Sequence, residues 1–251
     1  MYFHLCTFDL CSMSGHSKWS KVKHQKATTD VAKAQAFTKA SRAITVSVRE
    51  GGGITEPNLN FRLRLAIEKA RDVNMPKNTI ERAIEKGSGV DAVNLMQIAY
   101  ECFGPQGVAL LVETTTDNKM RTVSEVKNVL ERGGGRLASP GSVAYLFKRW
   151  GILVIPKANV TYDTLLTDAI VAGAHDVIER EDMFEVYTKP HDMHTISQKL
   201  ASMNLLIDNT ELIMHPVTPV SVDEKVKHLI DTLVTRLEEL DDVDHVYTNV
   251  Y

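Results

Sequence analysis

The chain has 251 residues, of which 43% are hydrophobic and 24% are charged, and its formal net charge is −3 at pH 7. These values are typical of a soluble globular protein and allow two or three domains. They exclude a membrane-spanning protein, because no apolar run is long enough to cross a bilayer.

Cysteine content and the N-terminus bear on the cellular compartment. Three cysteines are too few and too scattered for a disulfide framework, which favours a reducing, cytoplasmic location. Residues 1–12 contain no Lys or Arg and are typical of neither a secretory signal nor a transit peptide. Because Met13 directly precedes a basic stretch, we expect residues 1–12 to be an N-terminal extension.

Charge divides the chain into two parts. Residues 13–90, called the head below, carry 15 Lys/Arg and 7 Asp/Glu. Residues 91–251, called the body, carry 14 Lys/Arg and 24 Asp/Glu. A basic segment on an otherwise acidic chain suggests a polyanionic partner for that segment.

The head has the periodicity of helices. Between Asp30 and Glu50 an apolar stripe repeats at helical spacing, formed by Phe37, Ala40, Ile44 and Val48. Three glycines, residues 51–53, end this helix. A second amphipathic helix runs to about Val73 with Phe61, Leu65, Ala66 and Ala70 on its apolar side, and a short third helix ends at Gly87. We therefore predict a small basic helical domain over residues 13–90.

Beyond Gly89 the period becomes that of strands and helices in alternation. We expect a hairpin over 98–113, a helix over 120–131, a second hairpin over 142–156 and a helix over 164–174. Two short strands, a helix over 191–202, a strand within 205–216, a helix over 224–240 and a strand over 243–250 follow. Hairpins separated by helices indicate a multi-domain α+β fold with helices on one face of each antiparallel sheet.

Candidate catalytic and metal-binding motifs are weak. The glycines of 133–135 follow a helix and lack the Lys-Ser/Thr ending of a phosphate-binding loop, so a helix C-cap explains them better. Cys6, Cys11, His16 and His24 lack zinc-finger spacing. The acidic cluster at 238–244 is explained as a solvated helix end. We therefore expect no catalytic residue, metal or cofactor.

Several motifs in register resemble the YebC/PmpR family from about residue 13 to the C-terminus. They are Gly15-His16-Ser17-Lys18-Trp19, Lys23-His24-Gln25-Lys26, Phe37-Thr38-Lys39, Asn60-Phe61-Arg62-Leu63-Arg64, Ala66-Ile67, Asn74-Met75-Pro76, Arg82-Ala83-Ile84-Glu85-Lys86-Gly87, Tyr100-Glu101, Gly104-Pro105, Gly107-Val108-Ala109, Thr116-Asp117-Asn118, Arg121-Thr122, Gly141-Ser142-Val143-Ala144, Leu240-Asp241-Asp242-Val243 and Val246-Tyr247. Cys102 and Gln106 depart from the family pattern, which has glycines there.

The resemblance implies a domain arrangement and a partner. It implies a helical N-terminal domain (13–90) and two α+β, ferredoxin-like domains, one formed by 91–134 plus 205–251 and the other inserted as 135–204. Family members are described as DNA-binding transcriptional regulators, and others, including a mitochondrial translational activator, as ribosome-associated factors. Nucleic acid is therefore the expected partner, and no association with a membrane is expected.

We assign the expected nucleic-acid contacts to the head. Lysine and arginine side chains neutralise phosphates, and an aromatic ring set among them can stack on a base. Taken alone, Trp19 is better explained as an anchor of the N-terminal tail to its own domain. The candidate residues are His16, Ser17, Lys18, Trp19, Lys21, Lys23, His24, Lys26, Lys33, Lys39, Arg42, Arg62 and Arg64.

Three functions are compatible with these features. No helix-turn-helix spacing is evident, so RNA recognition by a ribosome-associated translation factor is slightly favoured over promoter binding. A DNA-binding transcriptional regulator is the alternative that the family description supports. A protein-interaction module that works through the acidic body is a further alternative. The oligomeric state stays open.

Overall fold

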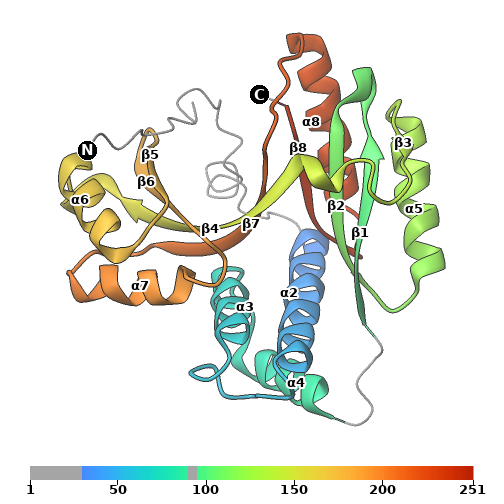
Figure 1. Ribbon diagram of the computed structural model, residues 1–251. Coiled ribbons are helices and arrows are strands. Elements are labelled where there is room, and N and C mark those ends of the chain that lie inside the picture. Colours follow the sequence, from blue (N-terminus) through green and yellow to red (C-terminus); the bar gives the residue numbers. More distant parts are fainter. Residues whose placement is uncertain (1–29, 90–94, 251) are drawn as a thin grey trace.

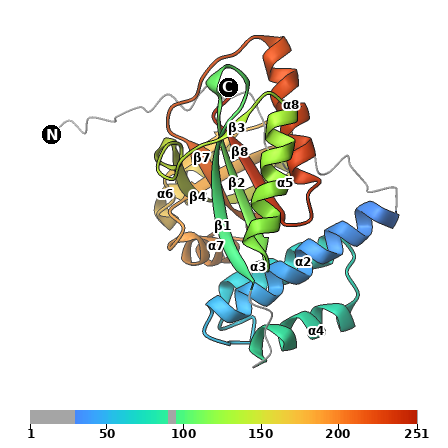
Figure 2. The same ribbon diagram turned by 90° about the vertical axis from the view of Figure 1, so that its right-hand side faces the viewer.

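The computed structural model describes residues 30–89 and 95–250 of the chain. Three helices of the head lie together at one end of the molecule, and the body forms two four-stranded sheets, each with helices against it (Figures 1 and 2). Within these described ranges, none of the helices has the length and apolarity needed to cross a membrane. The predicted multi-domain α+β fold with a helical N-terminal region is confirmed.

The described part of the head consists of α2 (Asp30–Glu50), α3 (Phe61–Asp72) and α4 (Lys77–Ser88). The stripe predicted for α2 is confirmed, since Ile44 and Val48 are fully buried in the core of the head. Gly87 lets α4 approach α2 closely, because a Cβ there would lie 2.7 Å from the carbonyl oxygen of Thr45. The head therefore has a small core of its own.

Helix α3 has two apolar faces. Leu63, Ile67 and Ala70 pack into the core of the head. Phe61 and Leu65 pack instead against the core of the second sheet of the body. The prediction that Phe61 and Leu65 share one inward face with the rest of α3 is wrong, because the helix lies between two apolar surfaces and serves both.

The first sheet, sheet A, has the strand order β3-β1-β2-β8. Its elements are β1 (Met96–Phe103), β2 (Ala109–Thr116), α5 (Lys119–Arg132), β3 (Arg136–Leu137), α8 (Glu224–Glu238) and β8 (Val243–Thr248), with a 3₁₀ turn at Pro105–Gly107. The predicted first hairpin is confirmed as β1 and β2. Leu130 of α5 and Leu233 of α8 meet Val112 in the core of this unit.

The second sheet, sheet B, has the strand order β5-β6-β4-β7, and all its pairings are antiparallel. Its elements are β4 (Phe147–Pro156), α6 (Tyr162–Ala172), β5 (Asp176–Glu179), β6 (Met183–Thr188), α7 (Met193–Ser202) and β7 (Asn209–Pro216), with 3₁₀ turns at Ala144–Leu146 and Lys157–Asn159. The succession βαββαβ is that of a ferredoxin-like unit. Helices α6 and α7 cover one face of it.

Two expectations about sheet B are wrong. In place of the expected hairpin over 142–156, a 3₁₀ turn at Ala144–Leu146 leads into one continuous strand, β4. Gly151, which suggests a turn, instead makes room for packing, since a Cβ there would lie 2.6 Å from both Met193 Sδ and Thr188 Oγ1.

The other error concerns β7. It pairs with β4 along its whole length, so it completes sheet B. The expectation that residues 205–251 complete the first unit is therefore wrong for this strand. Likewise Arg136 and Leu137 pair with β1 of sheet A, although residue 135 was the expected start of the inserted unit. Strand pairing decided both cases, because each sheet recruits a strand from beyond the expected boundary.

Candidate nucleic-acid interface

The predicted contact residues fall into two groups. His16, Ser17, Lys18, Trp19, Lys21, Lys23, His24 and Lys26 lie outside the described residues. Lys33, Lys39 and Arg42 lie on α2, and Arg62 and Arg64 lie on α3. The structure therefore bears on the C-terminal part of the proposed interface only.

Helix α2 uses part of its polar face to hold the body. Lys39 Nζ donates a hydrogen bond to the carbonyl oxygen of Glu238 at 2.5 Å, and Gln35 Nε2 donates one to that of Glu239 at 3.3 Å. These carbonyls lie at the C-terminal end of α8, where a helix leaves its acceptors unsatisfied and carries partial negative charge. The side chains of α2 thus cap a helix of the body.

Arg42 completes this contact at Asp242. Its Nη1 donates to the carbonyl oxygen of Asp241 at 2.8 Å and to Asp242 Oδ1 at 2.7 Å. The Asp242 carboxylate, 2% exposed, also accepts from Arg121 at 2.7 Å, from Thr122 at 2.7 Å and from Thr116 at 3.0 Å. We call this group around Asp242 the polar joint.

The charge state of Asp242 follows from these bonds. Burial by itself would raise the pKa of Asp242, but hydrogen bonds from Arg121 and the two threonines, with the Arg42 charge nearby, bring the pKa below its ordinary value. Asp242 is therefore ionised and paired, and the expectation that residues 238–244 form a solvated helix end is wrong at this position. Within the described ranges, no cluster of His, Cys, Asp and Glu is suited to hold a metal ion.

The two arginines of α3 are partly engaged within the head. Arg62 forms an ion pair with Glu50 at the end of α2. Arg64 donates to the carbonyl oxygens of Pro57 and Asn58, each at 3.3 Å. Lys33 is exposed on the first turns of α2. Of the five candidate residues in the described ranges, Lys33 is exposed, and the other four make hydrogen bonds within the protein.

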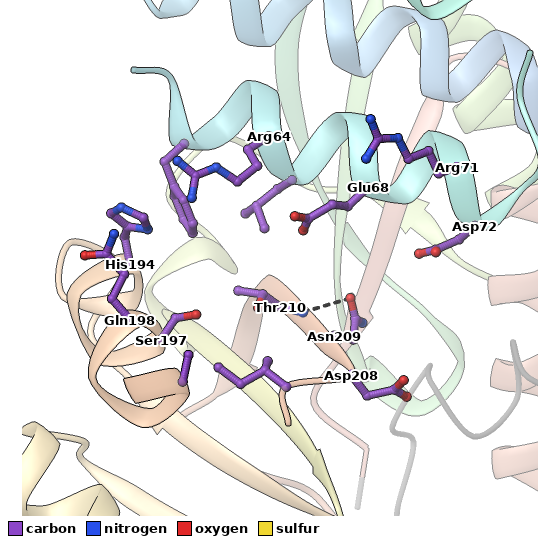
Figure 3. Close-up of a pocket in the computed structure, with 14 residues that line it drawn as sticks. Arg64, Glu68, Arg71, Asp72, His194, Ser197, Gln198, Asp208, Asn209 and Thr210 are labelled. Atoms are coloured by element: carbon purple, nitrogen blue, oxygen red, sulfur yellow. Dashed lines mark hydrogen bonds between the residues drawn. The ribbon is translucent and has the colours of Figure 1, made fainter. Parts of the chain in front are cut away.

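A pocket of about 440 Å³ separates α3 from sheet B (Figure 3). Its walls are α3, α7 and residues 207–210, with the ring of Phe61 lying 4.8 Å from that of His194. Glu68 points into the pocket, and Arg64 and Arg71 also line it (Figure 3). Beside the pocket, Lys69 Nζ binds Glu211 Oε1 at 2.7 Å. We call the packing of Phe61 and Leu65 of α3 against the core of sheet B the apolar joint, and the pocket and this ion pair lie beside it.

The pocket is lined by both basic and acidic side chains, and the acidic ones limit its ability to bind an anion. Burial and the facing carboxylate of Asp208 raise the pKa of Asp72, and Lys69 lowers it in part. Like-charged carboxylates in proximity disfavour a phosphate ligand there. The pocket therefore does not extend the cationic surface of the head.

Sequence reasoning missed one feature of the head. Helices α3 and α4 are separated only by residues 73–76, and Asn74 in this turn has a φ of 60°. A three- or four-residue turn between two helices is the spacing of a helix-turn-helix motif. The expectation that the head lacks such spacing is wrong. The dipeptide Asn74-Met75 before Pro76 was the local signal for it.

The architecture and the joints define a class of protein: a helical basic module joined to two α+β units. Comparison with known proteins places the chain within that class. The family model "TACO1/YebC protein N-terminal domain" matches residues 17–90, and the model "TACO1/YebC second and third domain" matches residues 95–250. The chain belongs to the TACO1/YebC family.

Relatives match over nearly the whole chain. A protein of Persephonella marina is 42% identical over 94% of this chain and 95% of its own length, and one of Acidithiobacillus ferrooxidans is 44% identical over 94% of each. Both are named "Probable transcriptional regulatory protein". A crystal structure of a conserved hypothetical protein from Aquifex aeolicus matches with a TM-score of 0.82 at 38% identity, covering 94% of this chain and 97% of that one. The predicted family is confirmed, and these names support a regulatory role.

Proposed function

We propose that the protein is a non-enzymatic, cytoplasmic regulator of gene expression whose head binds nucleic acid. The observation that carries the proposal is the charge division, with 15 Lys/Arg against 7 Asp/Glu in residues 13–90 and an acidic body. Phosphate contacts supply most of the affinity and little sequence information. The naming of relatives as regulatory proteins supports the same conclusion.

The contacts of α2 refine which residues carry the binding. Lys39 and Arg42 are hydrogen-bonded to the body, so they position the head as well as adding charge. Phosphate neutralisation is assigned mainly to Lys18, Lys21, Lys23 and Lys26. Lys33, the next lysine in the sequence, lies on α2 and is assigned the same role. His16 and Trp19 make the closer contacts. Ser17, His24, Arg62 and Arg64 flank them.

Charge reversal tests this proposal. The triple variant Lys21→Glu, Lys23→Glu, Lys26→Glu is expected to abolish nucleic-acid binding and to flatten its dependence on salt, measured by fluorescence anisotropy at two salt concentrations. The matched control reverses three exposed lysines of the body, Lys119, Lys127 and Lys225, with the same change in net charge. Equal affinity of the head variant and the wild-type protein at both salt concentrations would contradict the proposal.

Structured RNA of the translation machinery is the target that we favour. A cationic surface that lacks an obvious group of side chains for sequence-specific contacts to bases is suited to an RNA that is recognised by its shape and phosphate geometry. Duplex DNA is the second candidate, and the short turn between α3 and α4 is the observation that favours it. Lys77 and Arg82 are exposed on α4, where the second helix of such a motif would read a major groove.

These two targets are separated by one paired experiment. Ribosome co-sedimentation at moderate salt is compared with shifts of promoter fragments in the presence of competitor DNA, for wild-type protein and for Arg82→Glu. Retention on ribosomes that Arg82→Glu leaves intact supports RNA. Sequence-selective shifts that Arg82→Glu removes support DNA.

The remaining alternative is a protein-interaction module that works through the acidic body. It predicts that charge reversal at Lys21, Lys23 and Lys26 leaves regulation in cells unchanged. Complementation of a deletion strain with that variant decides between this alternative and nucleic-acid binding by the head.

A further inference from the structure

Sheet B has a face that its helices do not use. Leu153, Ile155 and Val186 point toward α6 and α7 and form one core with them. The alternate residues form a separate cluster on the opposite face, and among the described residues every member of that cluster belongs to a strand of sheet B: Ile152, Val154, Tyr187, Trp150, Ile178, Met183 and Ile213. Figure 1 shows α7 running along one side of β4 and β7.

Aromatic and imidazole rings gather on this second face. The ring of Trp150 on β4 stacks on that of His175 with centroids 4.5 Å apart and an interplanar angle of 29°. Tyr187 on β6 meets Trp150 edge-on at 6.4 Å and His215 on β7 at 5.8 Å. We call this surface the ring face. Its four rings span the whole width of the sheet, because His175 directly precedes β5.

Cations accompany the rings. Lys148 Nζ lies 4.7 Å from the centroid of the Trp150 ring, and Lys189 follows directly after β6 with its side chain exposed. The carboxylate of Glu185 is buried and neutralised, since Arg180 donates to it at 2.9 Å and the Tyr187 hydroxyl at 3.1 Å. Lys148 and Lys189 therefore supply positive charge at the accessible end of the ring face, where Asp176, which pairs with Tyr187, supplies one negative charge.

Accessibility is greatest where rings and cations meet. Lys148 and His175 are exposed and Trp150 is partly exposed, whereas Tyr187 lies beneath them. Lys148 reaches Trp150 on a flexible stem, so a planar ligand can replace its ammonium group over the ring while that group moves to a neighbouring anion. This combination of a stacking platform and mobile cations suits a base and its phosphates.

We propose that the ring face binds an unpaired stretch of polynucleotide. Trp150 and His175 stack on bases, and Lys148 and Lys189 bind the adjoining phosphates. A four-stranded sheet with rings on its central strands offers the geometry by which such sheets bind single strands, here with Trp150 on β4 and Tyr187 on β6. The site rests on the proposed function only in the class of ligand, since the head forms no part of it.

The fluorescence of Trp150 can report directly whether a ligand is bound at the ring face. The chain has two tryptophans, Trp19 and Trp150. Replacing either with Phe leaves one fluorescent reporter, on the ring face in Trp19→Phe and in the head in Trp150→Phe. Each full-length variant is titrated with a labelled short oligouridylate, in ribose and deoxyribose forms and as a duplex, and binding is followed independently by anisotropy of the label.

The expected result is quenching of Trp150 emission by single strands and not by the duplex. Because base stacking contributes about 1–3 kcal/mol, Trp150→Ala should weaken binding of the single strand by about 5- to 150-fold. Since that change also removes packing, Lys148→Glu serves as a second variant that leaves the strands intact. Its matched control is Lys127→Glu on α5, which should bind as the wild-type protein does.

Three outcomes would overturn the proposal. The first is binding, seen by anisotropy, that leaves Trp150 emission unchanged. The second is an absence of single-strand binding by the full-length protein. The third is a change in Trp150 emission with protein concentration alone, which would assign the ring face to a second copy of the chain. Quenching at Trp150 should persist after charge reversal at Lys21, Lys23 and Lys26, because the head forms no part of the ring face. Unchanged affinity of that variant for structured RNA would contradict the function proposed for the head and leave the ring face standing.

Discussion

The head contacts the body through two joints of opposite character. At the polar joint, Arg42 of α2 donates a hydrogen bond to the buried carboxylate of Asp242, which also accepts hydrogen bonds from Arg121 and Thr122 of α5. At the apolar joint, α3 lays Phe61 and Leu65 on the core of sheet B and leaves a pocket of about 440 Å³ beside them. A hydrogen-bonded charge tolerates little displacement, whereas apolar packing next to a pocket tolerates more. The head is therefore held by directional, charged hydrogen bonds at α2 and by apolar packing at α3.

Breaking the polar joint should have the largest effect. Asp242→Asn removes a charge that is 2% exposed and leaves Arg42 and Arg121 without their shared partner. We expect a loss of about 3 kcal/mol in the free energy of unfolding, measured by urea denaturation. Asp241→Asn is the control, because Asp241 contributes only its backbone carbonyl to Arg42. Equal stability of the two variants would show that the joint is not the stabilising element proposed here.

Breaking the apolar joint should cost less. Phe61→Ala removes a partly buried ring that contacts His194, and we expect a loss of about 2 kcal/mol. Leu59→Ala, at a residue 75% exposed, should change stability little. The measurement is thermal unfolding of all three proteins. A larger loss for Phe61→Ala than for Asp242→Asn would reverse the ranking of the joints.

A dependence on pH should distinguish the joints further. The pKa of Asp242 is lowered in the folded protein, so its stabilising contribution is complete above its ordinary pKa of 3.8 and is lost as the pH falls through the lower folded value. The stability difference between wild-type protein and Asp242→Asn should therefore shrink in acid. The difference between wild-type protein and Phe61→Ala should stay nearly constant. Denaturation at neutral pH and at several acid pH values checks both.

The ion pair beside the pocket should have the smallest effect. Lys69 and Glu211 are 40% and 18% exposed, so solvent screens their attraction. A double-mutant cycle with Lys69→Met and Glu211→Gln should give a coupling energy below about 1 kcal/mol. A coupling energy as large as the loss in Asp242→Asn would make the second joint polar as well.

Local pattern was sufficient for much of the fold. The apolar stripe of α2 predicted Ile44 and Val48 in the core, and the hairpin of β1 and β2 followed from alternation and its Gly-Pro turn. The motifs carrying the family resemblance extended this to the whole chain. These features depend on neighbours in sequence, which is why a single sequence reveals them.

Other features depend on contacts between distant residues. Arg121 and Asp242 are 121 positions apart, and nothing near either one shows that they bind each other. Gly151 indicated a turn because its packing partner, Met193, lies on another element. The rings of Trp150 and His175 likewise come together only when β4 and β5 join one sheet. The positions of Gln106 at a φ of 55° and of buried Cys102 also became clear only in the fold.

The capping of α8 by α2 has a consequence for synthesis of the chain. Lys39 and its acceptor at Glu238 are 199 positions apart, so this bond forms only after nearly the whole polypeptide has been made. A nascent chain, or one truncated before α8, therefore holds Lys39 and Arg42 without these acceptors. Completion of the C-terminal residues is what sets α2 in its final place.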